Sequence, residues 1–195
     1  MDTVVFAAVL LAAACHAGWN AAIKRTLDPL ATTVLISIGA AIAALAFAPF
    51  AGLPAPPAWP WVFASVLIHL GYFAALIESY RAGDMGQVYP LARGSAPLMT
   101  ATLSPLIVGE SVGTAAFAGI ALLAAGVALL SLGGGRDLGR INARAVGFAL
   151  LTAVTICAYS LVDGIGGRLA GDPNAYTAAL FAGVGPVMLV ELSRM

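Results

Sequence analysis

The chain has 195 residues, of which 61% are hydrophobic and 9% are charged, and its nine basic and nine acidic side chains cancel to zero net charge at pH 7. An ordinary soluble domain has about a quarter charged residues, so this composition excludes a soluble globular enzyme as the first interpretation, and it excludes a disordered chain. Nucleic acid is not expected as a partner, because phosphate binding needs a basic surface. The composition predicts an integral membrane protein whose main partner is the lipid bilayer.

Continuously apolar segments recur along the chain, each near the length of about 20 residues that crosses a bilayer as an α-helix. Continuous runs favour helices over the strands of a membrane barrel, which alternate with a period of two. Proline, glycine and charged residues separate the segments. The predicted fold class is an all-α, polytopic helical bundle. Its seven predicted transmembrane helices span residues 3–23, 31–50, 60–80, 86–107, 113–132, 145–164 and 175–193.

The first segment carries polar side chains at helical spacing. His16, Trp19 and Asn20 are three and four residues apart along the predicted helix, so they share one face. One interpretation is the polar wall of a substrate cavity, in which Trp19 stacks on the substrate and His16 carries a coupling proton. The alternative is structural: His16 and Asn20 hydrogen-bond to neighbouring helices, and Lys24 snorkels to the interface.

The third and sixth segments carry polar residues for which structural interpretations are favoured. His69 lies in the middle of its segment with Tyr72 on the same face, and we expect a buried histidine with satisfied hydrogen bonds. Glu78 and Arg81 are three residues apart near a helix end and are expected to pair at the membrane interface. Asp163, near the end of the sixth segment, is also expected to be interfacial.

The fourth segment places an arginine inside the membrane. One side of the predicted helix carries Tyr89, Arg93, Pro97, Thr100 and Ser104. Arginine keeps its charge, which costs about 2.5–3.5 kcal/mol at the bilayer centre on insertion scales, so Arg93 needs an anionic partner. That partner is either a carboxylate or phosphate group of a substrate, or Glu78 in a structural ion pair.

Small residues of the apolar segments have packing interpretations. Gly119 and Gly126 in the fifth segment are expected to be positions where helices approach closely. Cys15 and Cys157 lie in apolar stretches and are expected to be small buried hydrophobes and not a disulfide. The sequence has no CxxC or HExxH spacing, so we expect no metal and no cofactor.

An internal repeat is found when the chain is compared with itself. The aligned residues, with a four-residue insertion before the last pair, are Leu10-Leu11 with Leu150-Leu151, Trp19 with Tyr159, Asn20 with Ser160, and Asp28-Pro29 with Asp172-Pro173. The alternative is that alanine-rich helices resemble one another in any case. A first unit of five crossings would place the second unit in the opposite orientation, as in inverted-repeat transporters. We therefore expect a first five-helix repeat over 1–135, a polar linker over 136–144, and two helices of an incomplete second repeat over 145–195.

Two stretches of the chain resemble a known family. Tyr89-Pro90-Leu91-Ala92-Arg93-Gly94, with the later Pro97, Pro105, Gly109-Glu110, Gly119 and Gly126, is similar to the fourth and fifth helices of EamA-type transporters of the drug/metabolite transporter superfamily. His16-Ala17-Gly18-Trp19-Asn20 is similar to that family's first helix. The resemblance implies a ten-helix fold of two inverted five-helix repeats, to which this chain contributes a part.

The same resemblance implies a secondary transporter of small metabolites, amino acids or drugs in the inner cell membrane. In the smaller four-helix relatives, an essential glutamate of the first helix falls on His16, so their cation-export mechanism does not carry over. The predicted substrate-binding residues are His16, Trp19, Asn20, Tyr89 and Arg93.

The alternative function is a non-transporting integral membrane subunit or assembly factor. A membrane-embedded enzyme is not expected, because no loop is long enough to carry a soluble site. Homo-oligomerisation is left open. So is orientation: the Lys and Arg near the helix ends place the amino terminus outside, whereas the family resemblance places it inside.

Overall fold

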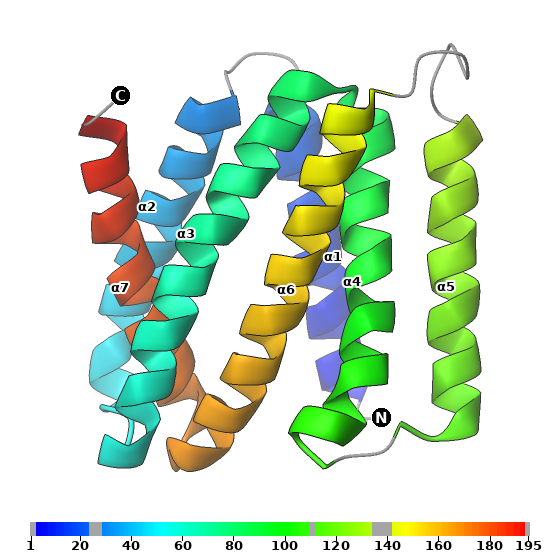
Figure 1. Cartoon of the computed structure of the whole chain (residues 1–195). Helices are drawn as coiled ribbons and strands as arrows, with labels where there is room; N and C mark the ends of the chain where they lie inside the picture. The colour runs from blue at the N-terminus through cyan, green and yellow to red at the C-terminus, as the bar shows by residue number, and fades with distance from the viewer. Residues whose placement is uncertain (1–2, 24–28, 110–111, 134–141, 194–195) are drawn as a thin grey trace.

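The computed structural model of the chain describes residues 3–23, 29–109, 112–133 and 142–193. These residues form seven α-helices, with one short 3₁₀ helix, η1 (Pro56–Ala58), before the third (Figure 1). The α-helices are α1 (Thr3–Ile23), α2 (Pro29–Ala51), α3 (Trp59–Ala82), α4 (Met85–Ile107), α5 (Thr114–Gly133), α6 (Ala143–Leu169) and α7 (Pro173–Ser193). All seven predicted helices are confirmed.

The helix ends differ from the predicted ones by a few residues, for local reasons. Helices α2 and α7 begin earlier than predicted, at Pro29 and Pro173. Proline suits a first helical position, because its missing N–H would have no partner there. Helix α6 begins at Ala143, inside the predicted linker, because the Asn142 side chain caps it by accepting the backbone N–H of Arg144 at 3.0 Å.

The most extensive helix contacts join α3 to α6 and α2 to α7. Helix α6 lies between α3 and α4, α7 packs on α2 and α3, and α5 packs on α4 (Figure 1). Successive helices alternate in direction, so α1 and α6 run oppositely (Figure 1). The backbone N–H of Ala55, before η1, donates to the carbonyl of Ala170, after α6, at 3.0 Å. This hydrogen bond ties the α2–α3 connection to the α6–α7 turn at one end of the bundle.

Buried hydroxyl groups are satisfied within their own helices. The Ser79 hydroxyl donates to the Leu76 carbonyl at 2.7 Å, and the Thr152 hydroxyl donates to the Phe148 carbonyl at 2.7 Å. Neither hydroxyl therefore needs a hydrogen-bond acceptor on another helix. Because serine and threonine side chains are small, neighbouring helices can pack closely against these positions.

Close helix approaches occur at glycines other than those predicted. A Cβ at Gly94 of α4 would collide with Val127 of α5, and a Cβ at Gly185 of α7 would collide with Ala41 of α2. The prediction that Gly119 and Gly126 are packing positions is wrong, since no described atom lies within 4 Å of a Cβ built at either. Both glycines lie on faces of α5 that are turned away from α4.

Apolar side chains cover the outside of the bundle. Phe50, Leu53 and Leu106 are among the large hydrophobic residues with more than four-fifths of their surface exposed, at 85%, 81% and 81%. In the described residues, three helical stretches are by length and composition long and apolar enough to cross a bilayer: Thr33–Ala51, Pro56–Ala82 and Ala143–Leu169. An apolar exterior is what a bilayer solvates, so the predicted membrane bundle is confirmed.

Helix α1 contributes exposed apolar side chains throughout its first part. The described side chains between Thr3 and Cys15 are all exposed. Cys157 of α6 is buried as predicted, but the prediction of a buried Cys15 is wrong. The reason is that the apolar run around Cys15 faces outward and does not pack against a neighbouring helix in the described structure.

Candidate functional site

A cavity of about 440 Å³ lies where α4 faces α5 and α6. Its polar lining comes from Arg93, Thr100 and Ser104 of α4 and Ser160 of α6. Its apolar lining comes from Ala96, Pro97, Ala101, Val112, Ile120 and Ile156. Among the described residues, the site thus combines one cation, a few hydroxyls and a mainly apolar wall, as small-molecule sites commonly do.

Helix α4 supplies most of this lining because of its residue spacing. Arg93, Pro97, Thr100 and Ser104 are three or four positions apart, so one helix face presents them to the cavity. Pro97 has no N–H to give to the carbonyl of Arg93, which leaves that carbonyl without its usual helical donor. Backbone of this kind is found within membranes where it lines a cavity or is buried in protein. Apart from Tyr89, the residues of the predicted α4 stripe therefore line one cavity.

Phenol groups hold the Arg93 guanidinium. Its Nη2 donates to the Tyr72 hydroxyl of α3 at 3.0 Å, and its Cζ lies 5.8 Å from the ring centroids of both Tyr72 and Tyr89. Tyr159 of α6 contacts Tyr72 edge to face, with ring centroids 5.7 Å apart. Cation–π contacts and a neutral hydrogen-bond acceptor orient a guanidinium without neutralising its charge. The charge of Arg93 is thus available to a ligand in the cavity.

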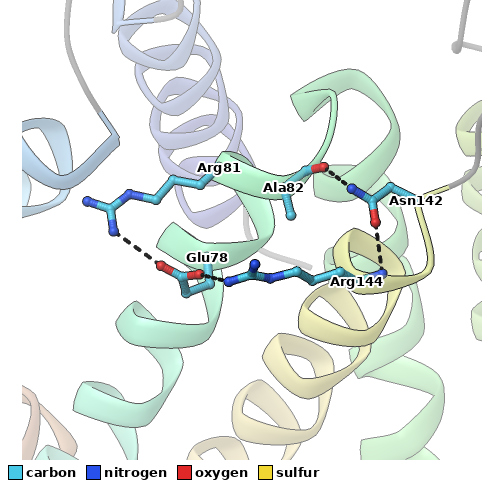
Figure 2. Close-up of polar contacts among 5 residues, drawn as sticks. All are labelled: Glu78, Arg81, Ala82, Asn142 and Arg144. Atoms are coloured by element: carbon cyan, nitrogen blue, oxygen red, sulfur yellow. Dashed lines mark hydrogen bonds and ion pairs between the residues drawn. The ribbon is translucent and has the colours of Figure 1, made fainter.

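The alternative partner of Arg93 is excluded by the geometry of Glu78. The Oε1 atom of Glu78 is 3.1 Å from Arg81, and its Oε2 atom is 3.0 Å from Arg144 (Figure 2). The predicted Glu78–Arg81 pair is confirmed, and the alternative ion pair between Glu78 and Arg93 is wrong. Glu78 lies in the last turns of α3, where it meets the start of α6, whereas the Arg93 side chain turns to Tyr72, six residues earlier in α3.

Arg93 forms no ion pair with any residue of the described ranges. The ion pairs found there join Glu78 to Arg81 and to Arg144. Arg93 also keeps part of its side chain exposed. A permanently charged group held in this way needs an anion to complete its coordination when solvent is excluded.

An aromatic cluster continues from Arg93 towards α7. His69 is buried, its Nδ1 atom lies 2.9 Å from the Ser65 carbonyl, and its ring stacks on Tyr159 with centroids 4.2 Å apart. The prediction of a buried, hydrogen-bonded histidine is confirmed. Asp163, predicted to be interfacial, accepts a hydrogen bond from the Tyr176 hydroxyl of α7 at 2.9 Å. This part of the bundle is thus fixed by contacts among its own side chains.

The five predicted site residues have different outcomes. Arg93 lines the cavity, and Tyr89 lies beneath its guanidinium without lining it. His16, Trp19 and Asn20 share helix α1, but their side chains lie outside the described residues. The substrate-binding role predicted for all five residues stays a prediction.

Sequence reasoning missed three polar residues of the site: Tyr72, Tyr159 and Ser160. A signal for two of them was present, because the repeat aligns Trp19 with Tyr159 and Asn20 with Ser160. Residues at equivalent positions of two repeats tend to face the same central site. Tyr72 carried no such signal, because its contact with Arg93 depends on how α3 meets α4.

Residues 109–113 read Gly-Glu-Ser-Val-Gly, which matches the GxSxG pattern of serine hydrolases. In the α/β-hydrolase fold, this pattern lies on a sharp turn from a strand into a helix. Here it lies between two helices, α4 and α5, and the serine itself is outside the described residues. The pattern therefore carries no prediction of hydrolase activity.

Comparison with known proteins identifies the family. The model of the EamA-like transporter family matches residues 3–132, which include α1 to α4, nearly all of α5, and the Arg93 stripe. No curated protein and no solved structure matches the chain. The family's helical membrane fold agrees with the bundle described above. The chain belongs to the EamA-like transporter family and is thus an EamA-type membrane protein of the drug/metabolite transporter superfamily.

Proposed function

We propose that this protein acts as a secondary transporter that moves small metabolites, amino acids or drugs by alternating access, with the Arg93 cavity as part of its substrate site. The observation that carries the proposal is the environment of the Arg93 side chain. Its guanidinium reaches a cavity within the bundle, is oriented by phenols, and has no carboxylate partner among the described residues. A carboxylate or phosphate group on the substrate would complete this arrangement.

The remainder of the cavity supports an amphiphilic substrate. Hydroxyl groups of Ser104 and Ser160 can exchange hydrogen bonds with polar atoms, and the alanine, isoleucine and proline lining can contact an apolar body. The Thr100 hydroxyl already donates to the Ala96 carbonyl at 2.9 Å, so it can still accept one. The cation would therefore set orientation, and the apolar wall would provide contact area.

The repeat supports alternating access. Helices α1 and α6 run in opposite directions (Figure 1). Helices α2 and α7 each begin at the proline of an Asp-Pro pair. Two repeats over 1–135 and 145–195, joined by the linker 136–144, would let one unit rock against the other around a central site. In this arrangement Trp19 and Asn20 would face the substrate from α1, as counterparts of Tyr159 and Ser160.

Transport by reconstituted vesicles tests this proposal. We expect the protein, in proteoliposomes, to accumulate at least one labelled compound from a panel of amino acids, monocarboxylates, organic phosphates and amphiphilic drugs. Empty vesicles set the baseline. Accumulation of none of them would favour the alternative, a non-transporting membrane subunit or assembly factor.

His16→Ala tests proton coupling in the same vesicles. Since an ordinary histidine titrates near pH 6.5, we expect wild-type transport to change across roughly pH 5.5–7.5 and the variant's profile to be flat there. Asn20→Ala on the same helix face is the matched control, which changes the rate but keeps the pH dependence. An unchanged pH profile in His16→Ala would remove His16 from coupling.

A further inference from the structure

We infer that Glu78, Asn142 and Arg144 form a gate that closes the transporter at one end of the bundle, leaving the Arg93 cavity to be reached from the other end. We call these three residues the α3–α6 clamp. The inference rests on the proposed function, because it assigns the clamp a part in the transport cycle. Its test reads the accessibility of a buried position and does not require a known substrate.

The clamp joins two helices that are far apart in sequence. Arg144 Nη2 of α6 is 3.0 Å from Glu78 Oε2 of α3 (Figure 2). Beside this pair, the Asn142 side-chain Nδ2 donates to the carbonyl of Ala82, the last residue of α3, at 2.7 Å (Figure 2). Helix α3 lies in the first predicted repeat, and Asn142 and Arg144 lie at the end of the predicted linker, where α6 leads into the second repeat. The two repeats are the units that must separate in alternating access.

Asn142 performs two tasks with one side chain. Its Oδ1 atom caps α6 by accepting the Arg144 backbone N–H at 3.0 Å, while its Nδ2 group is bound to α3 (Figure 2). The start of α6 is therefore fixed to the end of α3 through one short side chain. The position of the clamp depends on this cap.

Directly beyond the clamp, the interface between α4 and α6 is sealed by small residues. Val88 and Ala92 of α4 are buried together with Ala145 and Ala149 of α6. At the end of α3, a Cβ on Gly83 would lie 2.6 Å from the Ala145 Cβ, so the helices there are already as close as glycine allows. None of these four residues lines the Arg93 cavity.

The cavity begins on the far side of the seal. It extends along α4 from Arg93 to Ser104, about 16 Å at 1.5 Å per residue, and reaches Val112 at the turn between α4 and α5. That turn is at the opposite end of the bundle from the clamp (Figure 1). The α4–α6 interface is thus closely packed at the clamp end, and the Arg93 cavity lies towards the other end.

The Arg144–Glu78 ion pair of the clamp is solvent-exposed, so it can break and re-form during a transport cycle. The Arg144 and Glu78 side chains are 69% and 31% exposed, so water can replace each of them as the partner of the other. Ion pairs this exposed add little to the stability of a fold. A contact present in only one of two states of similar free energy can still determine which state is populated.

Labelling of a cysteine in the seal tests the gate. In a background without the native thiols, with Cys15→Ser and Cys157→Ala, Ala149→Cys places one thiol in the buried layer. We expect a membrane-impermeant thiosulfonate, added to the clamp side, to react slowly with it. Arg144→Gln should raise the labelling rate about two- to fivefold, because the rate follows the population of the open state and an exposed ion pair shifts that population only modestly.

Arg81→Gln is the matched control, because Arg81 binds the same carboxylate from within α3 and does not join two helices. We expect it to leave labelling unchanged, and Arg144→Lys to restore slow labelling. Asn142→Asp is a second, independent variant: it keeps the Oδ1 acceptor of the cap, loses the donor to Ala82, and should also raise the rate. Size-exclusion profiles identify any variant that does not fold.

Equal labelling in Arg144→Gln and Arg81→Gln, whether slow or fast, would overturn the gate. So would slow labelling in Asn142→Asp. The gate and the proposed function can fail separately. Selective opening by Arg144→Gln in a protein that transports nothing would sink the transport proposal alone, whereas transport with no selective opening would sink the gate alone.

Discussion

Arg93→Ala is expected to weaken binding of anionic substrates by about 30- to 1,000-fold, corresponding to a loss of roughly 2–4 kcal/mol. The loss is large because the guanidinium is the cation of the cavity lining, and the hydroxyls there cannot replace its charge. The folded yield should be unchanged, since Arg93 leaves behind no orphaned carboxylate among the described residues. Binding to purified protein and uptake by proteoliposomes provide the measurements.

Two controls separate charge from geometry. Arg93→Lys keeps the cation but loses the planar fork, so it should recover part of the affinity. Arg168→Ala removes an exposed cation near the end of α6 and should leave affinity unchanged. If Arg93→Ala is degraded or does not insert, or if it binds anions as the wild type does, Arg93 is a structural residue and not a ligand for the substrate.

Gly185→Ala is expected to lower the free energy of unfolding by about 1–3 kcal/mol, as overpacking commonly does. The added Cβ would collide with Ala41 of α2 and lie 3.2 Å from the backbone carbonyl oxygen of Ser37. These are a short side chain and a backbone atom, so neither can rotate away, and the two helices must move apart. Denaturant titration in detergent micelles, followed by circular dichroism, measures the change.

Gly126→Ala is the matched control for this variant. No described atom lies within 4 Å of a Cβ built at Gly126, and alanine is a better helix former than glycine by about 1 kcal/mol in soluble peptides. We expect this variant to be as stable as the wild type or more so. If Gly185→Ala and Gly126→Ala unfold at the same denaturant concentration, the close backbone approach of α2 and α7 is contradicted.

The sequence determined the helices and the faces that carry polar residues. Apolar runs, interrupted by Asp-Pro pairs and glycine-rich turns, indicated all seven helices within a few residues. The spacing of Arg93, Pro97 and Ser104 was sufficient to place them on one wall, because the helical period alone decides which residues share a face. The same period grouped His16, Trp19 and Asn20 on α1.

Only the tertiary structure decided which faces meet. Glu78 could have paired with Arg93, yet its partner on another helix is Arg144, 66 positions away along the chain. Close approach falls on Gly94 and Gly185, and Tyr72 supplies the partner of Arg93. The physical reason is that these helices are apolar nearly all the way round. Without a contrast between an apolar and a polar side, the sequence contains no mark of which side faces lipid and which faces a neighbouring helix.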